Sequence, residues 1–280
     1  MTNIEENIEL AAKALKKADA IIITAGAGMG VDSGLPDFRG NEGFWKAYPP
    51  IAKLGISFSG MANPQWFTTN PKLAWGFYGH RLNLYRKTEP HSGFTTLLKY
   101  ADEKKGKYFV FTSNVDGQFQ KAGFDENQIA ECHGSIHHLQ CHSACTRDIW
   151  SAEDIEIRVN EEILEAEEPL PKCIHCGSIA RPNILMFGDW NWLDERTSAQ
   201  ETRLDKWLNS IVNKKIVIVE CGAGSSVPTV RYKSESVAAS RNATLIRINP
   251  REYQVPHGHI SIPLGAKEGI EKIFNLLNTV

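Results

Sequence analysis

The sequence of 280 residues lacks any apolar run approaching the roughly 20 residues of a membrane-spanning helix. Residues 1–20 place isoleucine and leucine at helical spacing among glutamate and lysine, without the continuous apolar block of a signal peptide. The sequence also lacks a large excess of either charge, because it has 31 Lys and Arg and 33 Asp and Glu. A global attraction to nucleic acid or to anionic membranes is therefore excluded. We expect a cytoplasmic globular protein with an amphipathic N-terminal helix.

Cysteine is scarce, and four of the six cysteines fall into two close pairs, Cys141 with Cys145 and Cys173 with Cys176. In the absence of an export signal, metal-bound thiolates in a reducing compartment fit this spacing better than disulfides do. Two close pairs supply the four ligands of a tetrahedral zinc ion and leave no open position for water, so the predicted zinc is structural. A redox dithiol, or a neighbouring histidine in place of one thiolate, is the alternative.

Short apolar runs recur along the chain at residues 20–24, 108–112, 216–220 and 244–248. Each run ends in a polar or glycine-rich turn, and helical patterns lie between several of them. This order predicts an α/β fold, a Rossmann-like parallel sheet with helices on both faces. Ligands of such sheets bind at the carboxyl ends of the strands.

Two regions interrupt the alternation of strands and helices. Residues 44–90 are rich in aromatic side chains and predict a cofactor loop followed by a helical insertion, whereas residues 137–180 hold the cysteine pairs and predict a small zinc-binding module. The remaining segments, 1–43, 91–136 and 181–280, are assigned to the Rossmann-like nucleotide-binding domain. The default ligand site is the cleft between the insertions and the sheet.

The first apolar run leads directly into the glycine turn Gly26-Ala27-Gly28-Met29-Gly30. Glycines at this place let backbone N–H groups approach a diphosphate, although a tight strand-to-helix turn is an equally good interpretation. An acidic residue that would bind a ribose is missing about 20 residues further on, which disfavours a hydride-transfer enzyme. The loop Asp37-Phe38-Arg39 brings a carboxylate, a ring and a guanidinium close to the turn.

Polar side chains also follow the second run. Asn114 and Asp116 come directly after it, and His133 lies further along the chain. Taken singly, they fit two turn-forming residues and a buried structural histidine. Together, beside a glycine turn, they offer orientation, charge stabilisation and a proton acceptor near neutral pH.

With these motifs in order, nearly the whole chain resembles the sirtuins, a family of NAD-dependent protein-lysine deacylases. The resemblance rests on the glycine turn and Asp37-Phe38-Arg39, Thr112-Ser113-Asn114-Val115-Asp116, His133-Gly134, both cysteine pairs, Arg181-Pro182-Asn183-Ile184, Phe187-Gly188-Asp189, the turn after residue 220, and Asn249. It implies an acylated-lysine protein or peptide as partner and NAD as co-substrate. The implied products are free lysine, nicotinamide and O-acyl-ADP-ribose.

The resemblance also assigns roles to residues. His133 would be the general base, with Asn114 and Asp116 completing the catalytic set at the nicotinamide end. Adding a substrate strand at residues 186–188 would give affinity with little demand on sequence. The implied cofactor-binding residues are Ala25, Gly26, Ala27, Gly28, Asp37, Phe38, Arg39, Ser113, Asn114, Asp116, Gly222, Ser225, Ser226 and Asn249, and the implied substrate-binding residues are Tyr78, Arg81, Met186, Phe187 and Gly188.

Three positions depart from the family pattern. Gly30 stands where serine is usual, Ser113 where glutamine is usual, and Gly222-Ala223-Gly224 replaces Gly-Thr-Ser. Each change removes a side-chain hydrogen-bonding group near the nucleotide. Weaker NAD binding or a shift toward ADP-ribosyl transfer is the open alternative.

Tyr78 and Arg81 resemble the Tyr-x-x-Arg pair of the desuccinylase branch of the family. Residues three apart share one face of a helix, and a guanidinium can hold an acyl carboxylate with two hydrogen bonds. A packed tyrosine beside a solvated arginine is the equal alternative. At the level of the whole protein, an NAD glycohydrolase or mono-ADP-ribosyltransferase and a non-catalytic NAD-sensing module are the alternatives to a deacylase.

Overall fold

The central sheet of the protein is parallel and six-stranded. The computed structural model describes residues 3–36, 40–105 and 107–279, and over these ranges the strands run in the order β11-β10-β9-β1-β2-β3. The four strands expected from the sequence are present, and two three-residue strands extend the sheet at its edges. The bounds are β1 (Ala20–Ala25), β2 (Tyr108–Thr112), β3 (Ile129–Glu131), β9 (Ile216–Cys221), β10 (Thr244–Ile248) and β11 (Ile260–Ile262).

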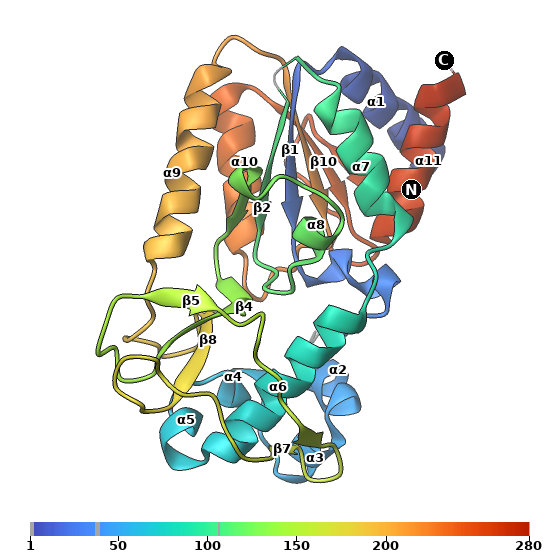
Figure 1. Cartoon of the computed structure of the whole chain (residues 1–280). Helices are drawn as coiled ribbons and strands as arrows, with labels where there is room; N and C mark the ends of the chain where they lie inside the picture. Colours follow the sequence, from blue (N-terminus) through green and yellow to red (C-terminus); the bar gives the residue numbers. More distant parts are fainter. Residues whose placement is uncertain (1–2, 37–39, 106, 280) are drawn as a thin grey trace.

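Helices cover both faces of this sheet, which confirms the predicted α/β fold (Figure 1). Ile21 and Ile23 of β1 face one helical layer, whereas Ala20 and Ile22 face the other, so every residue of the strand is buried. A continuous β-branched run is what a strand covered on both sides requires. The first layer contains α1 (Ile4–Lys17), α7 (Ser92–Asp102) and α11 (Ala266–Thr279), and the second contains α9 (Glu195–Ser210) and α10 (Thr229–Arg241).

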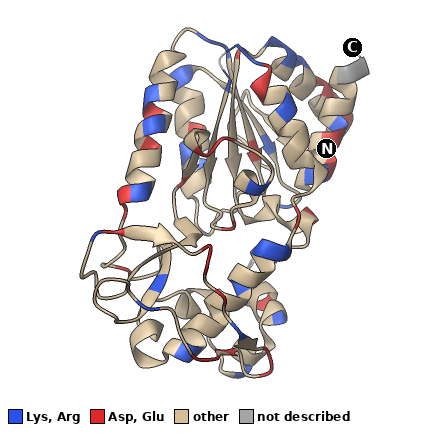
Figure 2. Ribbon diagram, in the orientation of Figure 1, with Lys and Arg blue, Asp and Glu red and all other residues tan. Residues whose placement is uncertain are grey.

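The predicted N-terminal amphipathic helix is α1. The Asn3 side chain accepts a hydrogen bond from the Glu6 N–H, and acidic residues in the first turn with lysines in the last complement the helix dipole. Ile8, Ala11 and Leu15 are buried in the core of the first helical layer, whereas Leu10 is exposed. Figure 2 shows both signs of charge mixed along this and the other outer helices, in keeping with the formal net charge of -2.

Below the sheet in Figure 1 lies a second body of helices and short antiparallel strands. The helices are α2 (Gly40–Ala47), α3 (Pro49–Lys53), α4 (Phe58–Met61), α5 (Trp66–Thr69) and α6 (Pro71–Lys87), and the strands are β4 (Gly134–Cys141), β5 (Ile149–Ser151), β6 (Val159–Asn160), β7 (Glu165–Ala166) and β8 (Ala180–Ile184). A short helix, α8 (Gln118–Lys121), lies between β2 and β3 in the sequence, and its Phe119 packs in the core of the first helical layer.

The two predicted insertions share one apolar core. Phe77 and Tyr78 of α6 pack in the same cluster as Leu164 and Ala166 from the cysteine-bearing segment. Strand β8 pairs antiparallel with β4 rather than joining the large sheet, so its residues lie with the cysteine-bearing segment instead of with the nucleotide-binding domain to which the sequence assigned residues 181–184.

Candidate active site

The residues predicted for the site gather at one edge of the sheet. The register pairs Ala25 with both Thr112 and Cys221, so β1, β2 and β9 end at the same level. The Ser113 N–H donates to the Ala25 carbonyl (3.1 Å), and Asn114 Nδ2 donates to the Gly26 carbonyl (3.1 Å). The glycine turn and the segment after β2 are therefore in direct contact, as the rule for parallel sheets predicts.

Two glycine turns pack against each other at this edge. The N–H groups of Gly26 and Gly28 donate to the carbonyls of Cys221 and Gly222, both at 3.0 Å. A Cβ on Gly222, whose φ is +63°, would lie 2.3 Å from the Gly28 carbonyl carbon. These glycines are needed for close approach of the two turns. The expectation that their N–H groups face a diphosphate is wrong for Gly26 and Gly28, because those donors are already used.

The departure at Gly30 has a packing reason. A Cβ at this position would come within 3.0 Å of Leu35 Cδ1, and Leu35 is buried in the second apolar core. The Gly30 N–H donates to the Ala27 carbonyl within the turn. A serine at this position would require the Leu35 side chain to shift by a few tenths of an ångström.

His133 lies between the start of α10 and the segment that follows β8. Its Nε2 is 3.4 Å from Thr229 Oγ1, and its backbone carbonyl accepts from the Leu185 N–H at 3.0 Å. Cys132, the preceding residue, donates its N–H to the Thr112 carbonyl, which ties the histidine to the end of β2. Burial lowers the pKa of the imidazole from its usual 6.5. The ring is therefore neutral, and able to accept a proton, at neutral pH.

Asp116 is a buried carboxylate in a tight turn. Its Oδ1 accepts from the Gln118 N–H at 3.0 Å, and its backbone carbonyl accepts from His137 Nε2 at 2.9 Å. Burial raises the pKa of the carboxyl to about 6, the hydrogen bond from Gln118 opposes this, and the charge of Glu131 adds to it. The group is ionised at pH 7 but titrates much closer to neutrality than an exposed aspartate.

A cavity of about 390 Å³ adjoins this carboxylate. Tyr85 of α6, Asp116, and Ser135 and His137 of β4 contribute to its wall. It therefore lies between the end of the sheet and the two insertions, where the sequence predicted a cleft. His133 and Asn114 are not among its described lining residues.

Tyr78 and Arg81 are both buried on α6, with 1% and 7% of their surfaces exposed. Arg81 Nε donates to Tyr85 Oη at 3.0 Å, and its guanidinium lies within 5.6 Å of the ring centres of Phe77, Tyr78 and Tyr85. Burial raises the pKa of Tyr78 to about 12, and its hydroxyl has no hydrogen-bond partner in the described part of the chain. The interpretation with a solvated arginine is wrong, because Arg81 is buried. Tyr78 and Arg81 form a buried pair of polar side chains on one helix.

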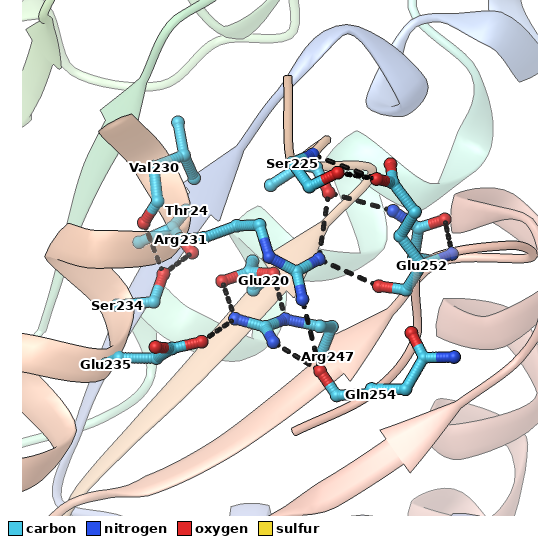
Figure 3. Close-up of polar contacts among 12 residues, drawn as sticks. Thr24, Glu220, Ser225, Val230, Arg231, Ser234, Glu235, Arg247, Glu252 and Gln254 are labelled. Atoms are coloured by element: carbon cyan, nitrogen blue, oxygen red, sulfur yellow. Dashed lines mark hydrogen bonds and ion pairs between the residues drawn. The ribbon is translucent and has the colours of Figure 1, made fainter. Parts of the chain in front are cut away.

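On the predicted adenosine side, a carboxylate joins the loop after β9 to the loop after β10 (Figure 3). Glu252 accepts from the Ser225 N–H (3.0 Å) and contacts its hydroxyl, while the Glu252 N–H donates to Asn249 Oδ1 (3.0 Å). Asn249 Nδ2 in turn donates to the Ala223 carbonyl. Ser226 is exposed beside them. Sequence reasoning missed Glu252, although an acidic residue three positions after Asn249 was a signal.

Beneath this loop lies a buried ion pair that the sequence analysis also missed. Glu220 and Arg247 occupy paired positions on β9 and β10, each 1% exposed, and Arg247 Nη2 also reaches Glu235 of α10 at 2.8 Å. Arg231 donates to the Glu252 carbonyl at 2.8 Å, next to this pair in Figure 3. The sequence does contain a signal for this pair, because each of two apolar strands includes one charged residue, Glu220 and Arg247.

The predicted substrate segment begins next to the residue that contacts His133, because the Leu185 N–H donates to the His133 carbonyl. Met186 is buried, Phe187 is 42% exposed, and the Phe187 N–H donates to the Ala62 carbonyl at 2.9 Å. Phe187 and Gly188 form a turn, with Gly188 at a φ of +68°, so β8 ends before the predicted strand-like segment. Asp37, Phe38 and Arg39 lie outside the described residues, so their predicted role stays a prediction.

The four paired cysteines form one cluster in which all sulfur atoms lie within 4.8 Å of one another. The Sγ atoms of Cys141 and Cys176 are 3.7 Å apart, and those of Cys145 and Cys173 are 3.6 Å apart. A tetrahedron with zinc–sulfur bonds of about 2.3 Å has edges of about 3.8 Å, so these thiols fit a structural zinc ion. The described cysteines form no disulfide.

Comparison with known proteins agrees with this geometry. A model of the Sir2 family matches residues 26–211. The NAD-dependent protein deacylase of Aquifex aeolicus (strain VF5) is 28% identical over 92% of this chain and 95% of that protein, and that of Leptospira interrogans serovar Lai is 30% identical over 86% of each. The solved structure of a Sir2 homolog in complex with NAD superimposes with a TM-score of 0.70 at 24% identity, over 97% of this chain and 94% of the other. No described helix is both long and apolar enough to cross a membrane. The chain belongs to the Sir2 family, which confirms the resemblance to sirtuins.

Proposed function

We propose that this protein is an NAD-dependent protein-lysine deacylase. One observation carries the proposal: a neutral half-buried imidazole, an amide and a buried carboxylate follow the carboxyl ends of two neighbouring parallel strands, and the amide is bonded to the glycine turn. Relatives across most of the chain are named NAD-dependent protein deacylases. The reaction consumes acyl-lysine, NAD and one water, and it releases lysine, nicotinamide and O-acyl-ADP-ribose.

The residues present fit this chemistry. NAD, when bound, supplies a ribose carbon that the acyl oxygen attacks as nicotinamide leaves. Asp116, ionised in a buried place, stabilises the positive charge that develops on the ribose, and Asn114 orients the nicotinamide end. His133 accepts the proton of a ribose hydroxyl, for which a neutral imidazole is suited. The segment 186–188 binds the substrate backbone by strand addition.

Product analysis tests the proposal against its rivals. The protein is incubated with NAD and an acetylated peptide, and the products are identified by mass spectrometry. A deacylase forms nicotinamide and O-acetyl-ADP-ribose in equal amounts, only when the peptide is present. ADP-ribose formed without peptide would indicate a glycohydrolase, a mass increase on protein would indicate ADP-ribosyl transfer, and no products would indicate an NAD-sensing module.

We also propose a cytoplasmic location. Its support is the chemistry of the cysteine cluster, because four thiolates on a zinc ion persist best in a reducing compartment. The partner in this proposal is an acylated protein.

The acyl preference of the site depends on Arg81. If its guanidinium binds an acyl carboxylate, Arg81→Met should lower kcat/KM for a succinylated peptide about 10- to 100-fold, as expected for hydrogen bonds to a charged group, and change deacetylation by much less. Tyr78→Phe removes one hydroxyl without changing shape and should lower desuccinylation alone. Equal losses on both acyl groups would show that the pair only stabilises α6.

The pKa of Asp116 predicts the acid side of the pH profile. Because the carboxylate is the form that stabilises positive charge, kcat/KM should fall as the pH drops through about 6. Lowering of the His133 pKa moves its protonation to more acidic pH than usual. We expect Asp116→Asn to be slower at every pH and to lose the limb near pH 6. An unchanged limb in this variant would assign it to another group.

A further inference from the structure

Strand β4 contains a bulge close to its start. The register joins Ser135 with Asn183 and Leu139 with Pro182, so residues 136–138 of β4 have no partner on β8. Bulges re-aim side chains and are frequent next to active sites. The hydrogen-bonding groups of residues 136 and 137 are therefore free to contact another part of the molecule.

Two of these groups contact the turn that carries Asp116. The Ile136 N–H donates to the Val115 carbonyl at 3.0 Å, and His137 Nε2 donates to the Asp116 carbonyl at 2.9 Å. A carbonyl oxygen only accepts, so a proton of the imidazole must be on Nε2. Burial lowers the pKa of His137, so the ring is neutral at neutral pH and its one proton is used in this hydrogen bond.

The imidazole also packs against the next residue of the turn, Gly117. The φ of Gly117 is +70°, and a Cβ there would lie 2.7 Å from His137 Cδ2, so the ring and the turn fit together only with glycine at this position. The N–H of Gln118, which follows, donates to Asp116 Oδ1 at 3.0 Å. The conformation of the turn therefore sets the direction of the Asp116 carboxylate.

The backbone of His137 is itself fixed. Its N–H donates to Ser135 Oγ at 3.2 Å, and its carbonyl accepts from the Ala152 N–H at 2.9 Å. Because β4 begins at Gly134, directly after His133, one segment carries both the proposed base and the histidine that contacts the turn. The bulge thus connects the proposed base to the proposed charge-stabilising carboxylate, although the two follow different strands.

We infer that His137 is a positioning residue that holds the turn at Asp116 and Gly117 and thereby directs the Asp116 carboxylate toward the nicotinamide end of NAD. The inference rests on the proposed function. His137 acts through the backbone carbonyl of Asp116 and takes no part in the proton transfer assigned to His133. Small displacements of a group that stabilises developing charge lower the rate of the chemical step more than they weaken binding of the substrate.

The test measures kcat for nicotinamide release from NAD with an acetylated peptide. His137→Leu is similar in size but has no donor, and it should lower kcat about five- to tenfold, the effect of one hydrogen bond, while KM for the peptide stays within about twofold. His137→Gln places an amide N–H where Nε2 was and should keep kcat within about twofold of the original protein. His138→Leu is the matched control, because His138 lines the same cavity and its Nδ1 has no hydrogen-bond partner in the described part of the chain.

An unchanged kcat in His137→Leu would overturn the inference, as would equal losses in the leucine and glutamine variants, because a histidine that only fills space needs no donor. If His137→Leu does not fold, His137→Asn takes its place. The asparagine amide is too short to reach the Asp116 carbonyl, so the same loss is expected and an unchanged kcat has the same meaning.

Hydrogen–deuterium exchange separates the inference from the proposed function. The peptide that covers residues 113–118 should exchange faster in His137→Leu than in the original protein and in His137→Gln, because the turn loses one of its supports. If the original protein forms no O-acyl-ADP-ribose, the proposed function fails, and this measurement still decides whether His137 holds the turn. Equal exchange in the three proteins would overturn the inference.

Discussion

Replacing His133 by tyrosine should lower kcat for deacylation by at least about a hundredfold, the range expected for loss of a general base. The phenol of tyrosine does not accept a proton near neutral pH. NAD affinity should change little, because the residues proposed to bind the nucleotide lie in the glycine turns and in the loops after β9 and β10. A large effect on turnover with a small one on binding distinguishes a catalytic residue from one that merely binds the cofactor.

The structure explains why this position suits a base. The ring is half-buried next to Thr229, the backbone carbonyl of His133 accepts from the Leu185 N–H, and the lowered pKa keeps the imidazole neutral. Tyrosine is larger than histidine, so His133→Asn serves as a smaller variant that removes the base without crowding the cleft. His257→Asn, at an exposed site, is the matched control.

Single-turnover release of nicotinamide and calorimetric titration with NAD are the two measurements. Release of nicotinamide should survive in part in His133→Asn, since the first bond cleavage does not need the base, whereas O-acyl-ADP-ribose should not form. Turnover close to that of the original protein in both variants would contradict the assignment and return His133 to a structural role.

Removing the zinc ion should abolish deacylation and lower the melting temperature by at least about 10 °C, because a structural zinc contributes several kcal/mol to folding and each kcal/mol shifts a domain of this size by about 2–4 °C. The effect reaches the active site through two strands. β4 runs from Gly134, next to His133, to the ligand Cys141, and β8 leads from beside Cys173 and Cys176 to Leu185.

Cys176→Ser tests this without a chelator, and His175→Asn is its matched control. His175 lies next to Cys176 in the sequence, and its Nε2 is 2.7 Å from Asp148 Oδ2. If His175 were a zinc ligand, His175→Asn would also lose the metal. We expect one zinc ion per chain by elemental analysis in the original protein and in His175→Asn, and none in Cys176→Ser. Full activity of metal-free protein would rule out the proposed link between metal and cleft.

The sequence predicted the sheet well because its strands are long, apolar and β-branched. It missed β3 and β11, which have three residues each and are strands only because neighbouring strands supply their hydrogen bonds. The direction of the glycine N–H groups was mispredicted for a similar reason. Their acceptors at Cys221 and Gly222 lie almost two hundred residues away, where local patterns carry no information.

The proposed active-site residues were easier to identify from the sequence than the residues that support them. Asn114, Asp116 and His133 follow strands, and parallel strands bring such residues together. Glu252, the pair Glu220 and Arg247, and the contact of His137 with the Asp116 carbonyl were missed, because they depend on which groups face one another in the fold. His137 in particular lies close to the cysteine pairs in the sequence, where nothing local distinguishes it from His138.

The apolar core shared by residues 44–90 and 137–180 has an evolutionary consequence. Gly76 of α6 approaches the other segment so closely that a Cβ there would lie 1.9 Å from the Leu164 carbonyl oxygen, and Trp75 donates to the Ala180 carbonyl across the same boundary. Neither insertion has a complete apolar core of its own. Either insertion alone would expose half of a core, so a substitution on one side of this boundary is constrained by the residues on the other side.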